Sequence, residues 1–216
     1  MYKAVIFDLD GTLLDTLKDL ANSVNYALRQ FSFPERTTDE VRRFIGNGVI
    51  KLMQRATPDG IDEETFEKCF NTFRTHYLEH MYDNTKPYEG VEEMLSLLRG
   101  KGVKTAVVSN KLHSGVVGLC EDFFKGQLTS AYGVNTEDER KPQPKNVFKA
   151  LSDLGVSAEE TVYIGDSEVD VQTAKNAGLK CIGVTWGFRS EDELLEAGAE
   201  YIAHTSEETA EIVLSF

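Results

Sequence analysis

The sequence predicts an α/β fold, with a Rossmann-like parallel sheet core flanked by helices and an inserted all-helical cap domain. After Pro87, short apolar runs that end at glycine or polar residues alternate with segments of helical spacing, as in a parallel sheet. Residues 16–85, in contrast, contain helical patterns and no convincing strand pattern. We therefore expect a core domain of residues 1–15 plus 86–216, and a helical cap domain of residues 16–85.

The composition is typical of a soluble globular protein, since 41% of the 216 residues are hydrophobic and 27% are charged. A net charge of -13 argues against nucleic acid or an anionic membrane surface as a partner. No apolar stretch approaches the ~20 residues of a membrane span, and no signal segment is recognisable before the first strand. The three cysteines lie far apart, as expected for reduced thiols. We expect a cytoplasmic monomer or small homo-oligomer.

The first strand is predicted at Val5-Ile6-Phe7, which leads directly into Asp8 and Asp10. Open α/β sheets place their ligands at this carboxyl end of the strands. Side chains two apart in an extended chain point the same way, so the two carboxylates should lie together and need a cation or a shared proton. The alternative is that both aspartates serve a turn. A calcium loop is disfavoured because two leucines and a helix follow, without further oxygen ligands.

The inserted domain contains apolar residues at helical spacing. Helices are predicted over residues 16–30 and 62–81, from Thr38 onward, and, after a break at 45–49, through Leu52 to Pro58. The Gly46-Asn47-Gly48 break between the middle two helices is either a plain turn or a substrate contact, because Asn-Gly favours turns. Arg55 is either a solvated helix residue or a ligand for a substrate carboxylate.

The remaining chain alternates between predicted helices and predicted strands. Helices are expected over 91–99, 147–154, 169–177 and 191–197, and strands over 103–108, 161–164, 179–184 and 201–203. Residues 123–134 form a weaker apolar segment without a clear assignment. This alternation implies a parallel sheet with helices on both faces.

Polar residues follow every strongly predicted strand. Ser109-Asn110-Lys111 follow the second strand and Gly165–Asp170 follow the third, so both groups should meet Asp8 and Asp10 at one edge of the sheet. Up to four carboxylates gathered there would bind a hard cation, and Mg²⁺ is the natural candidate. The hydroxyl, the backbone amides and a lysine suit an anion with several oxygens, such as a phosphoryl group.

With these segments the chain resembles the phosphatases of the haloacid dehalogenase (HAD) superfamily. The matching segments occur in the family's order and span most of the chain: Asp8-Leu9-Asp10-Gly11-Thr12, Ser109-Asn110, Lys141-Pro142-Gln143-Pro144, and Gly165-Asp166-Ser167 with Asp170. The resemblance implies a magnesium-dependent hydrolase that acts on a small phosphorylated metabolite.

The resemblance also implies roles for individual residues. Asp8 would be the nucleophile that forms an aspartyl-phosphate, and Asp10 would be the general acid and then the general base. The presence of Asp10 favours phosphoryl transfer over dehalogenation, because a halide leaves without a proton. Lys141 would neutralise charge between nucleophile and phosphate. Lys145 is the alternative lysine, but Lys141 matches the motif position before Pro142.

The remaining site residues fall into two groups by the same resemblance. Ser109, Asn110, Gly11 and Thr12 would bind the phosphoryl oxygens. The Mg²⁺ ligands would come from the four aspartates, with Asp170 either binding the ion or orienting a metal-bound water. The four aspartates are Asp8, Asp10, Asp166 and Asp170.

Two further segments resemble phosphoglycolate phosphatases: Phe44–Gly48, continuing to Arg55, and Gly183–Phe188. The resemblance makes phosphoglycolate the leading substrate, with Asn47 and Arg55 as candidate substrate-binding residues. A phosphomutase of the β-phosphoglucomutase type or a pyrophosphatase on the same fold remains an alternative. A non-catalytic binding or regulatory module is the alternative outside this class, although such a module has no need for Asp8, Asp10, Lys141 and Asp166 together.

Overall fold

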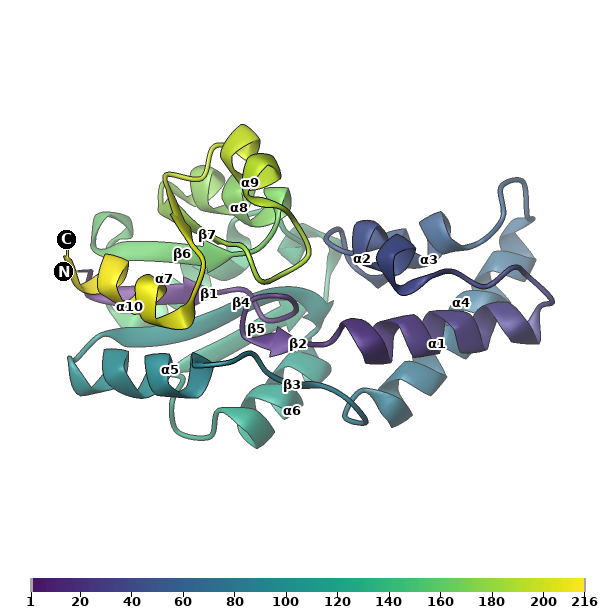
Figure 1. Ribbon diagram of the computed structural model, residues 1–216, viewed down its shortest axis with the longest axis horizontal. Helices are drawn as coiled ribbons and strands as arrows, with labels where there is room; N and C mark the ends of the chain where they lie inside the picture. The colour runs from purple at the N-terminus through teal and green to yellow at the C-terminus, as the bar shows by residue number, and fades with distance from the viewer. Residues whose placement is uncertain (1, 216) are drawn as a thin grey trace. The chain divides into compact units, whose positions relative to one another are not determined.

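The computed structural model describes residues 2–215 and divides the chain into two compact units (Figure 1). Unit 1 comprises Met1–Leu14 and Pro87–Phe216, and unit 2 comprises Asp15–Lys86. The chain divides between residues 14 and 15, one residue before the predicted boundary at 15/16. It divides again between residues 86 and 87, one residue after the predicted boundary at 85/86.

The described part of unit 1 contains a six-stranded sheet in the order β5-β4-β1-β6-β7-β8. All neighbouring strands in it run parallel, which confirms the predicted fold class. The fully buried strand β1 lies between β4 and β6, so its carboxyl end opens into the middle of the sheet edge. The bounds are β1 Ala4–Phe7, β4 Lys104–Leu112, β5 Ser130–Val134, β6 Thr161–Gly165, β7 Lys180–Val184 and β8 Tyr201–Ala203.

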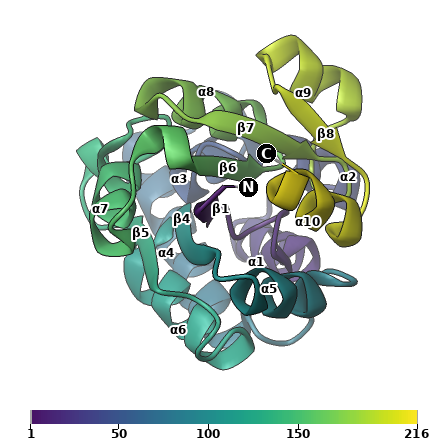
Figure 2. The same ribbon diagram turned by 90° about the vertical axis from the view of Figure 1, so that its left-hand side faces the viewer.

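Helices cover both faces of this sheet (Figure 2). Helices α7 and α8 pack on one face against β1, β4, β6 and β7, and α5, α6 and α10 lie on the other. Apolar side chains such as Ile6, Val108 and Val147 fill the layer beneath α7 and α8. The bounds are α5 Val91–Gly100, α6 His113–Phe123, α7 Lys145–Leu154, α8 Glu168–Ala177, α9 Glu191–Ala197 and α10 Ser206–Ser215, with short 3-10 turns at Glu137–Glu139 and Ala158–Glu160.

Three features of unit 1 differ from the sequence prediction. Strand β4 does not end at Val108 but continues through the polar residues to Leu112, with a shift in its register against β5. Helix α6 is not among the predicted helices, and the unassigned segment 123–134 begins at its last residue and ends in the edge strand β5, whose first three residues are only partly buried. Helix α10 was not predicted, because its apolar face is short and interrupted by glutamates.

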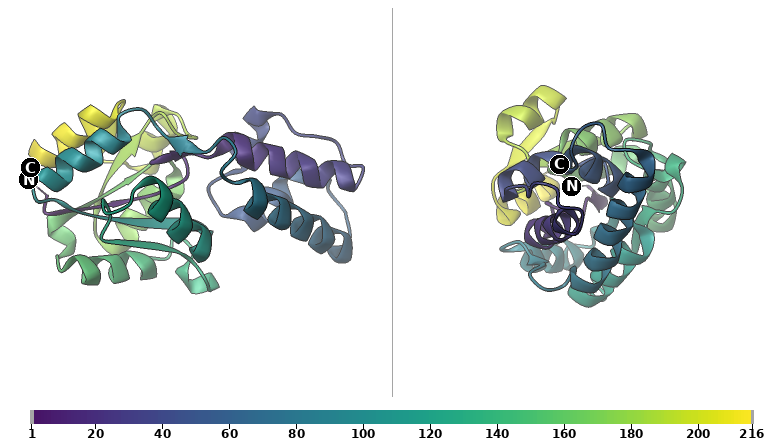
Figure 3. Two further views of the ribbon diagram at one scale, coloured as in Figure 1. Left: turned by 90° about the horizontal axis from the view of Figure 1, so that it is seen from below. Right: turned by 90° about the vertical axis from the view of Figure 1, so that its right-hand side faces the viewer.

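Unit 2 is helical within residues 16–85, and α1 and α4 lie side by side along most of their length (Figure 3). Thr37 and Asp62 cap the helices that follow them by accepting hydrogen bonds from backbone N–H groups. The short strands β2 (Leu14–Asp15) and β3 (Lys86–Pro87) pair where the chain passes between the units. The helices are α1 Leu17–Gln30, α2 Thr38–Phe44, α3 Val49–Ala56 and α4 Glu63–His80.

The three cysteines are all reduced and buried. Among residues 2–215, none of the helices combines the length and the apolar character that crossing a bilayer requires.

Candidate active site

The loop that follows β1 brings Asp8 to the carboxyl edge of the sheet. The Asp8 N–H still donates to the Ile164 carbonyl at 2.9 Å, so its backbone is held as firmly as the strand itself. The chain then turns at Gly11, whose φ of +92° lies in the region that favours glycine. A side chain at Gly11 would also lie only 2.4 Å from Asp166 Oδ2. The glycine therefore permits both the turn and a close approach to a second carboxylate.

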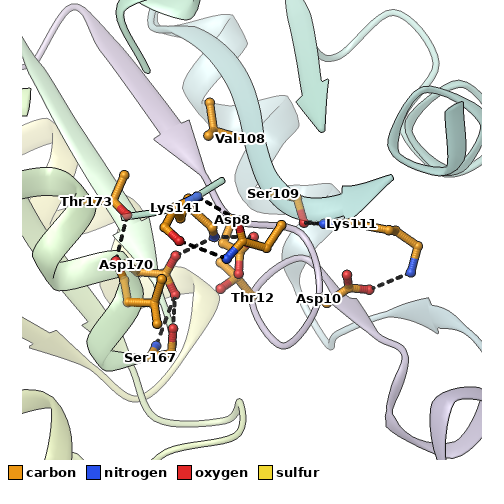
Figure 4. A network of polar contacts seen from close by, with 12 residues as sticks. Asp8, Asp10, Thr12, Val108, Ser109, Lys111, Lys141, Ser167, Asp170 and Thr173 are labelled. Carbon is orange, nitrogen blue, oxygen red and sulfur yellow. Dashed lines mark hydrogen bonds and ion pairs between the residues drawn. The ribbon is translucent and has the colours of Figure 1, made fainter. Parts of the chain in front are cut away.

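Lys141 lies between two of the carboxylates (Figure 4). Its Nζ is 2.8 Å from Asp8 Oδ1 and 2.7 Å from Asp170 Oδ1, and its side chain is buried. The Asn110 side chain positions the lysine by accepting from its backbone N–H at 2.7 Å and donating to its carbonyl at 3.3 Å. Lys145, the alternative lysine, is exposed and pairs with Asp138.

Asp166 and Asp170 are held by neighbours of their own. Thr12 Oγ1 donates to Asp166 Oδ1 at 3.0 Å, and the Phe188 N–H donates to Asp166 Oδ2 at 2.8 Å. Asp170 Oδ2 accepts from the N–H and the hydroxyl of Ser167 at 3.1 and 2.6 Å. Both carboxylates are therefore oriented before any ligand binds.

Three buried carboxylates thereby form a compact group among the described residues. Asp8, Asp166 and Asp170 each offer one oxygen, and these oxygens lie within 4.8 Å of one another. With Lys141 protonated, three ionised carboxylates and one ammonium leave a charge of -3 + 1 = -2. A divalent cation would neutralise that charge.

Burial shifts the ionisation of this group. It raises the pKa of Asp8 to about 7, against the opposing effect of Lys141. Burial, with Asp170 and Asp8 nearby, also holds the pKa of Asp166 well above its usual range. Burial alone would lower the pKa of Lys141, but Asp170 and Asp8 outweigh it and keep that pKa well above its ordinary value. Without a cation, the group therefore retains a proton near neutral pH.

Asp10 does not join this group. Its Oδ1 lies 3.1 Å from Lys111 Nζ, and its carboxylate is partly exposed (Figure 4). The structure thus brings together three carboxylates where the sequence predicts up to four. The physical reason is that β1 ends at Phe7, so the alternation of an extended strand does not continue through Asp8 to Asp10.

Ser109 and the polar residues after it lie in β4, which is central enough to bury them. Ser109 is 2% exposed, and its hydroxyl accepts from the Lys111 N–H at 3.3 Å. Asn110 contacts Lys141 and Lys111 contacts Asp10, so strand backbone rather than a flexible loop carries these contacts to the site.

Three residues support the site in a way that the sequence does not predict. Ser167 stands three residues before Asp170, a spacing typical of a capping box that could have identified it. The Phe188 N–H and the Trp186 indole, which donates to the Thr12 carbonyl at 3.0 Å, come from the loop after β7. The sequence marks that loop only by its resemblance, because no sequence pattern reveals which backbone or indole N–H group contacts residues so distant along the chain.

In unit 2, the two candidate substrate-binding residues contact each other. Arg55 Nη2 donates to Asn47 Oδ1 at 2.7 Å, and Nη1 donates to the Phe44 carbonyl at 2.7 Å. Gly46 and Gly48 both have positive φ, at 126° and 83°. Arg55 therefore holds the turn at Gly46-Asn47-Gly48 by hydrogen bonds. Whether Asn47 and Arg55 also bind substrate stays a prediction.

Comparisons with known proteins agree with this architecture. The family model for haloacid dehalogenase-like hydrolases matches residues 5–184. A phosphoglycolate phosphatase from Aquifex aeolicus is 36% identical over 187 residues, covering 86% of each chain. Phosphoglycolate phosphatase 1 from Pseudomonas aeruginosa is 32% identical over 225 aligned positions, covering 98% of this chain and 82% of that one.

A solved structure is similar along the whole chain. The crystal structure of a protein from Lactobacillus delbrueckii subsp. bulgaricus, provisionally named a phosphoglycolate phosphatase, matches with a TM-score of 0.95 and 35% identity. The match covers 100% of this chain and 99% of that one. The fold and the acidic site thus define a hydrolase built on a parallel α/β sheet. The chain belongs to the haloacid dehalogenase-like hydrolases, and it is a phosphoric monoester hydrolase.

Proposed function

We propose that this enzyme is a Mg²⁺-dependent phosphatase that hydrolyses a small phosphate monoester through an aspartyl-phosphate on Asp8. The observation that carries the proposal is the ion pair of Lys141 with both Asp8 and Asp170, inside the group of three buried carboxylates. A carboxylate held beside a buried ammonium and a cation-binding group is suited to attack an anionic electrophile, because the positive charges offset its repulsion from the phosphate.

The reaction has two steps. In the first, a carboxylate oxygen of Asp8 bonds to phosphorus, the bond to the ester oxygen breaks, and Asp10 gives that oxygen a proton. In the second, Asp10 takes a proton from water as the water oxygen bonds to phosphorus, which releases inorganic phosphate and restores Asp8. Lys141 neutralises charge between the nucleophile and the phosphoryl group throughout.

The donor set fits Mg²⁺. Asp8, Asp166 and Asp170 supply hard oxygen atoms, and their net charge together with Lys141 matches a divalent cation. When bound, the cation would stabilise the negative charge of the transferring phosphoryl group. Two of these carboxylates are held in place by hydrogen bonds: Asp166 by Thr12 and Phe188, and Asp170 by Ser167.

The phosphoryl oxygens are proposed to bind the Ser109 hydroxyl and the amides of Asn110, Gly11 and Thr12. The side chains of Asn110 and Thr12 already have structural partners, Lys141 and Asp166. Backbone N–H groups are suited to bind an anion, and those of Gly11 and Thr12, which donate to the Leu14 and Leu9 carbonyls at 2.9 and 3.3 Å, would exchange these bonds for bonds to the phosphoryl oxygens.

Phosphoglycolate is the leading substrate, because relatives that match 86% or more of this chain are named phosphoglycolate phosphatases. Asn47 and Arg55 are proposed to help recognise the substrate from unit 2. Replacing Asn47 with Ala should then alter the ratio of kcat/KM for phosphoglycolate to that for an aryl phosphate. Equal loss on both substrates would mean that the residue serves folding only. We further propose a cytoplasmic enzyme that acts as a monomer or small homo-oligomer.

A phosphate-release assay tests the proposal. Purified enzyme is assayed on a panel of phosphorylated metabolites that includes phosphoglycolate, a hexose phosphate and pyrophosphate, with Mg²⁺, Ca²⁺ or excess chelator. We expect activity with Mg²⁺, little with Ca²⁺, and almost none with chelator. The Asp8→Asn variant keeps the shape of the residue and should form no phosphoenzyme. Full activity in chelator would show that the enzyme does not need a divalent cation. Phosphate release by Asp8→Asn would show that Asp8 is not the nucleophile.

A further inference from the structure

We propose that Lys111 is the positioning residue of Asp10, and that its ammonium keeps the Asp10 carboxylate out of the cation-binding group. This inference rests on the proposed function, in which Asp10 transfers protons during both steps. It assigns a role to a residue that the phosphatase reaction, as described above, does not use.

The contact that supports this role is a largely buried ion pair. Lys111 Nζ lies 3.1 Å from Asp10 Oδ1, and the side chains of the two residues are 5% and 16% exposed. Surface ion pairs contribute little to positioning because water screens them, whereas a pair in this environment is screened much less. The Asp10 carboxylate therefore has a fixed neighbour that lies outside the group of Asp8, Asp166 and Asp170.

The fold directs Lys111 toward Asp10. Strand β4 shifts its register between Val108 and Leu112, and Lys111 lies within that irregular stretch. The stem of Lys111 then runs past Gly115 in α6, where an added Cβ would lie 3.6 to 3.7 Å from its Cγ, Cδ and Cε. The stem thus packs against a helix, and this packing favours the position of the ammonium beside Asp10.

The need for such a residue follows from the charges at the site. Asp10 is two residues from Asp8, and a divalent cation held by three carboxylates could recruit a fourth. A carboxylate bound to the cation cannot give a proton to the leaving oxygen or take one from water. Lys141 pairs with Asp8 and Asp170, whereas Lys111 pairs with Asp10. The two lysines therefore separate the metal-binding carboxylates from the one that transfers protons.

Rapid-quench kinetics on Lys111→Met, which keeps the stem and removes the charge, tests this role. The aryl oxide of an aryl phosphate leaves without a proton, so the rate at which this substrate phosphorylates Asp8 should change by less than threefold. Phosphoenzyme should then accumulate. An alkyl ester such as phosphoglycolate needs the proton, so its first step should slow at least tenfold. Calorimetry should show Mg²⁺ affinity unchanged or up to tenfold tighter, because Asp10 becomes available to the cation.

A double-mutant cycle separates positioning from folding. If Lys111 acts through Asp10, adding Lys111→Met to Asp10→Asn should change the first step by less than twofold. Lys111→Arg should restore most of the alkyl-ester rate, and Lys145→Met, which removes an exposed lysine, should behave as the wild type. If Lys111→Met does not fold, Lys111→Gln carries the same expectations.

Additive losses in the cycle, equal losses on both substrates, or weaker Mg²⁺ binding in Lys111→Met would each overturn the role of Lys111. The proposed function fails in a distinguishable way, because the wild type itself would then form no phosphoenzyme. A wild type that forms phosphoenzyme, together with additive losses in the cycle, would reject the positioning role alone.

Discussion

Asp8 and Asp10 are separated by one residue but occupy different electrostatic environments. Asp8 is buried beside Lys141 and Asp170, and burial raises its pKa to about 7. Asp10 is more exposed and pairs with Lys111 instead. Two carboxylates with different neighbours can perform different chemistry in one site, which is the arrangement that a nucleophile and a proton-transfer group require.

The Asp10→Asn variant should separate the two steps of the reaction. With an aryl phosphate, we expect a burst of product followed by a slow steady state, because the first step survives partly while water is no longer deprotonated. With an alkyl ester the first step should fall by ~10²–10⁴-fold, the usual range for proton-transfer catalysis. Rapid-quench kinetics with trapping of alkali-labile protein phosphate measures both steps. Equal loss on the two substrates without a burst would make Asp10 a structural residue.

The affinity for Mg²⁺ should rise with pH. Because the pKa of Asp8 is raised from 3.8 to about 7, a proton must leave this carboxyl before a cation binds at lower pH. The apparent dissociation constant should therefore fall as the pH rises from about 5.5 to 7, by about tenfold per pH unit for each proton released. Calorimetric titration across this range checks the expectation. Asp8→Asn should reduce the dependence to the part that Asp166 contributes, because the pKa of Asp166 is raised as well, and a wild-type affinity that does not vary with pH would contradict the expectation.

At the scale of elements, the loop after β7 closes over Asp166. A side chain at Gly187 would lie 2.3 Å from Asp166 Cβ and 2.4 Å from the Gly11 carbonyl. The loop can approach this closely only because the residue is glycine. The same loop supplies the Phe188 N–H and the Trp186 indole, so it supports both the carboxylate and the turn after β1.

Gly187→Ala should consequently weaken Mg²⁺ binding. Either Asp166 or the turn at Gly11 must move to accommodate the methyl group, and changes in residues that support metal ligands typically cost 10–100-fold in affinity. Mg²⁺ titration of the folded variant measures this effect. Gly100→Ala is the matched control, because nothing lies within 4 Å of its added Cβ, and we expect wild-type affinity there. Unchanged affinity in Gly187→Ala would show that the loop yields without disturbing Asp166.

The elements also show what the sequence could and could not predict. The core strands β1, β6 and β7 were predictable because each is a short apolar run buried on both faces. The edge strand β5 was not, since its partly exposed residues lack that pattern. The separation of Asp10 from Asp8 depends on the end of β1 at Phe7. The residues around Phe7 do not show from the sequence alone that the strand ends there.

At the scale of the whole molecule, unit 2 is stabilised by hydrogen bonds of its own around one buried carboxylate. Asp19 in α1 is 1% exposed and accepts from the segment that follows α4. Its Oδ2 accepts from the N–H groups of Asn84 and Thr85 at 2.9 and 2.8 Å, and its Oδ1 accepts from Asn84 Nδ2 at 2.7 Å. The Thr85 hydroxyl adds a bond of 3.0 Å. One carboxylate therefore connects the first helix of the unit to its last residues.

Asp19→Ala should destabilise unit 2 by about 2–4 kcal/mol, because it leaves several donors, including two backbone N–H groups, without their acceptor in a largely buried site. Since the bonds all lie within residues 15–86, amide hydrogen exchange should accelerate in α1 and α4 while protection of β1 and β6 is retained. Exchange monitored by mass spectrometry on the full chain resolves the two units. Lys18→Ala, at the exposed neighbouring position, should leave exchange unchanged. Equal acceleration in both units would mean that they unfold as one cooperative structure, and that the division of the chain has no counterpart in its stability.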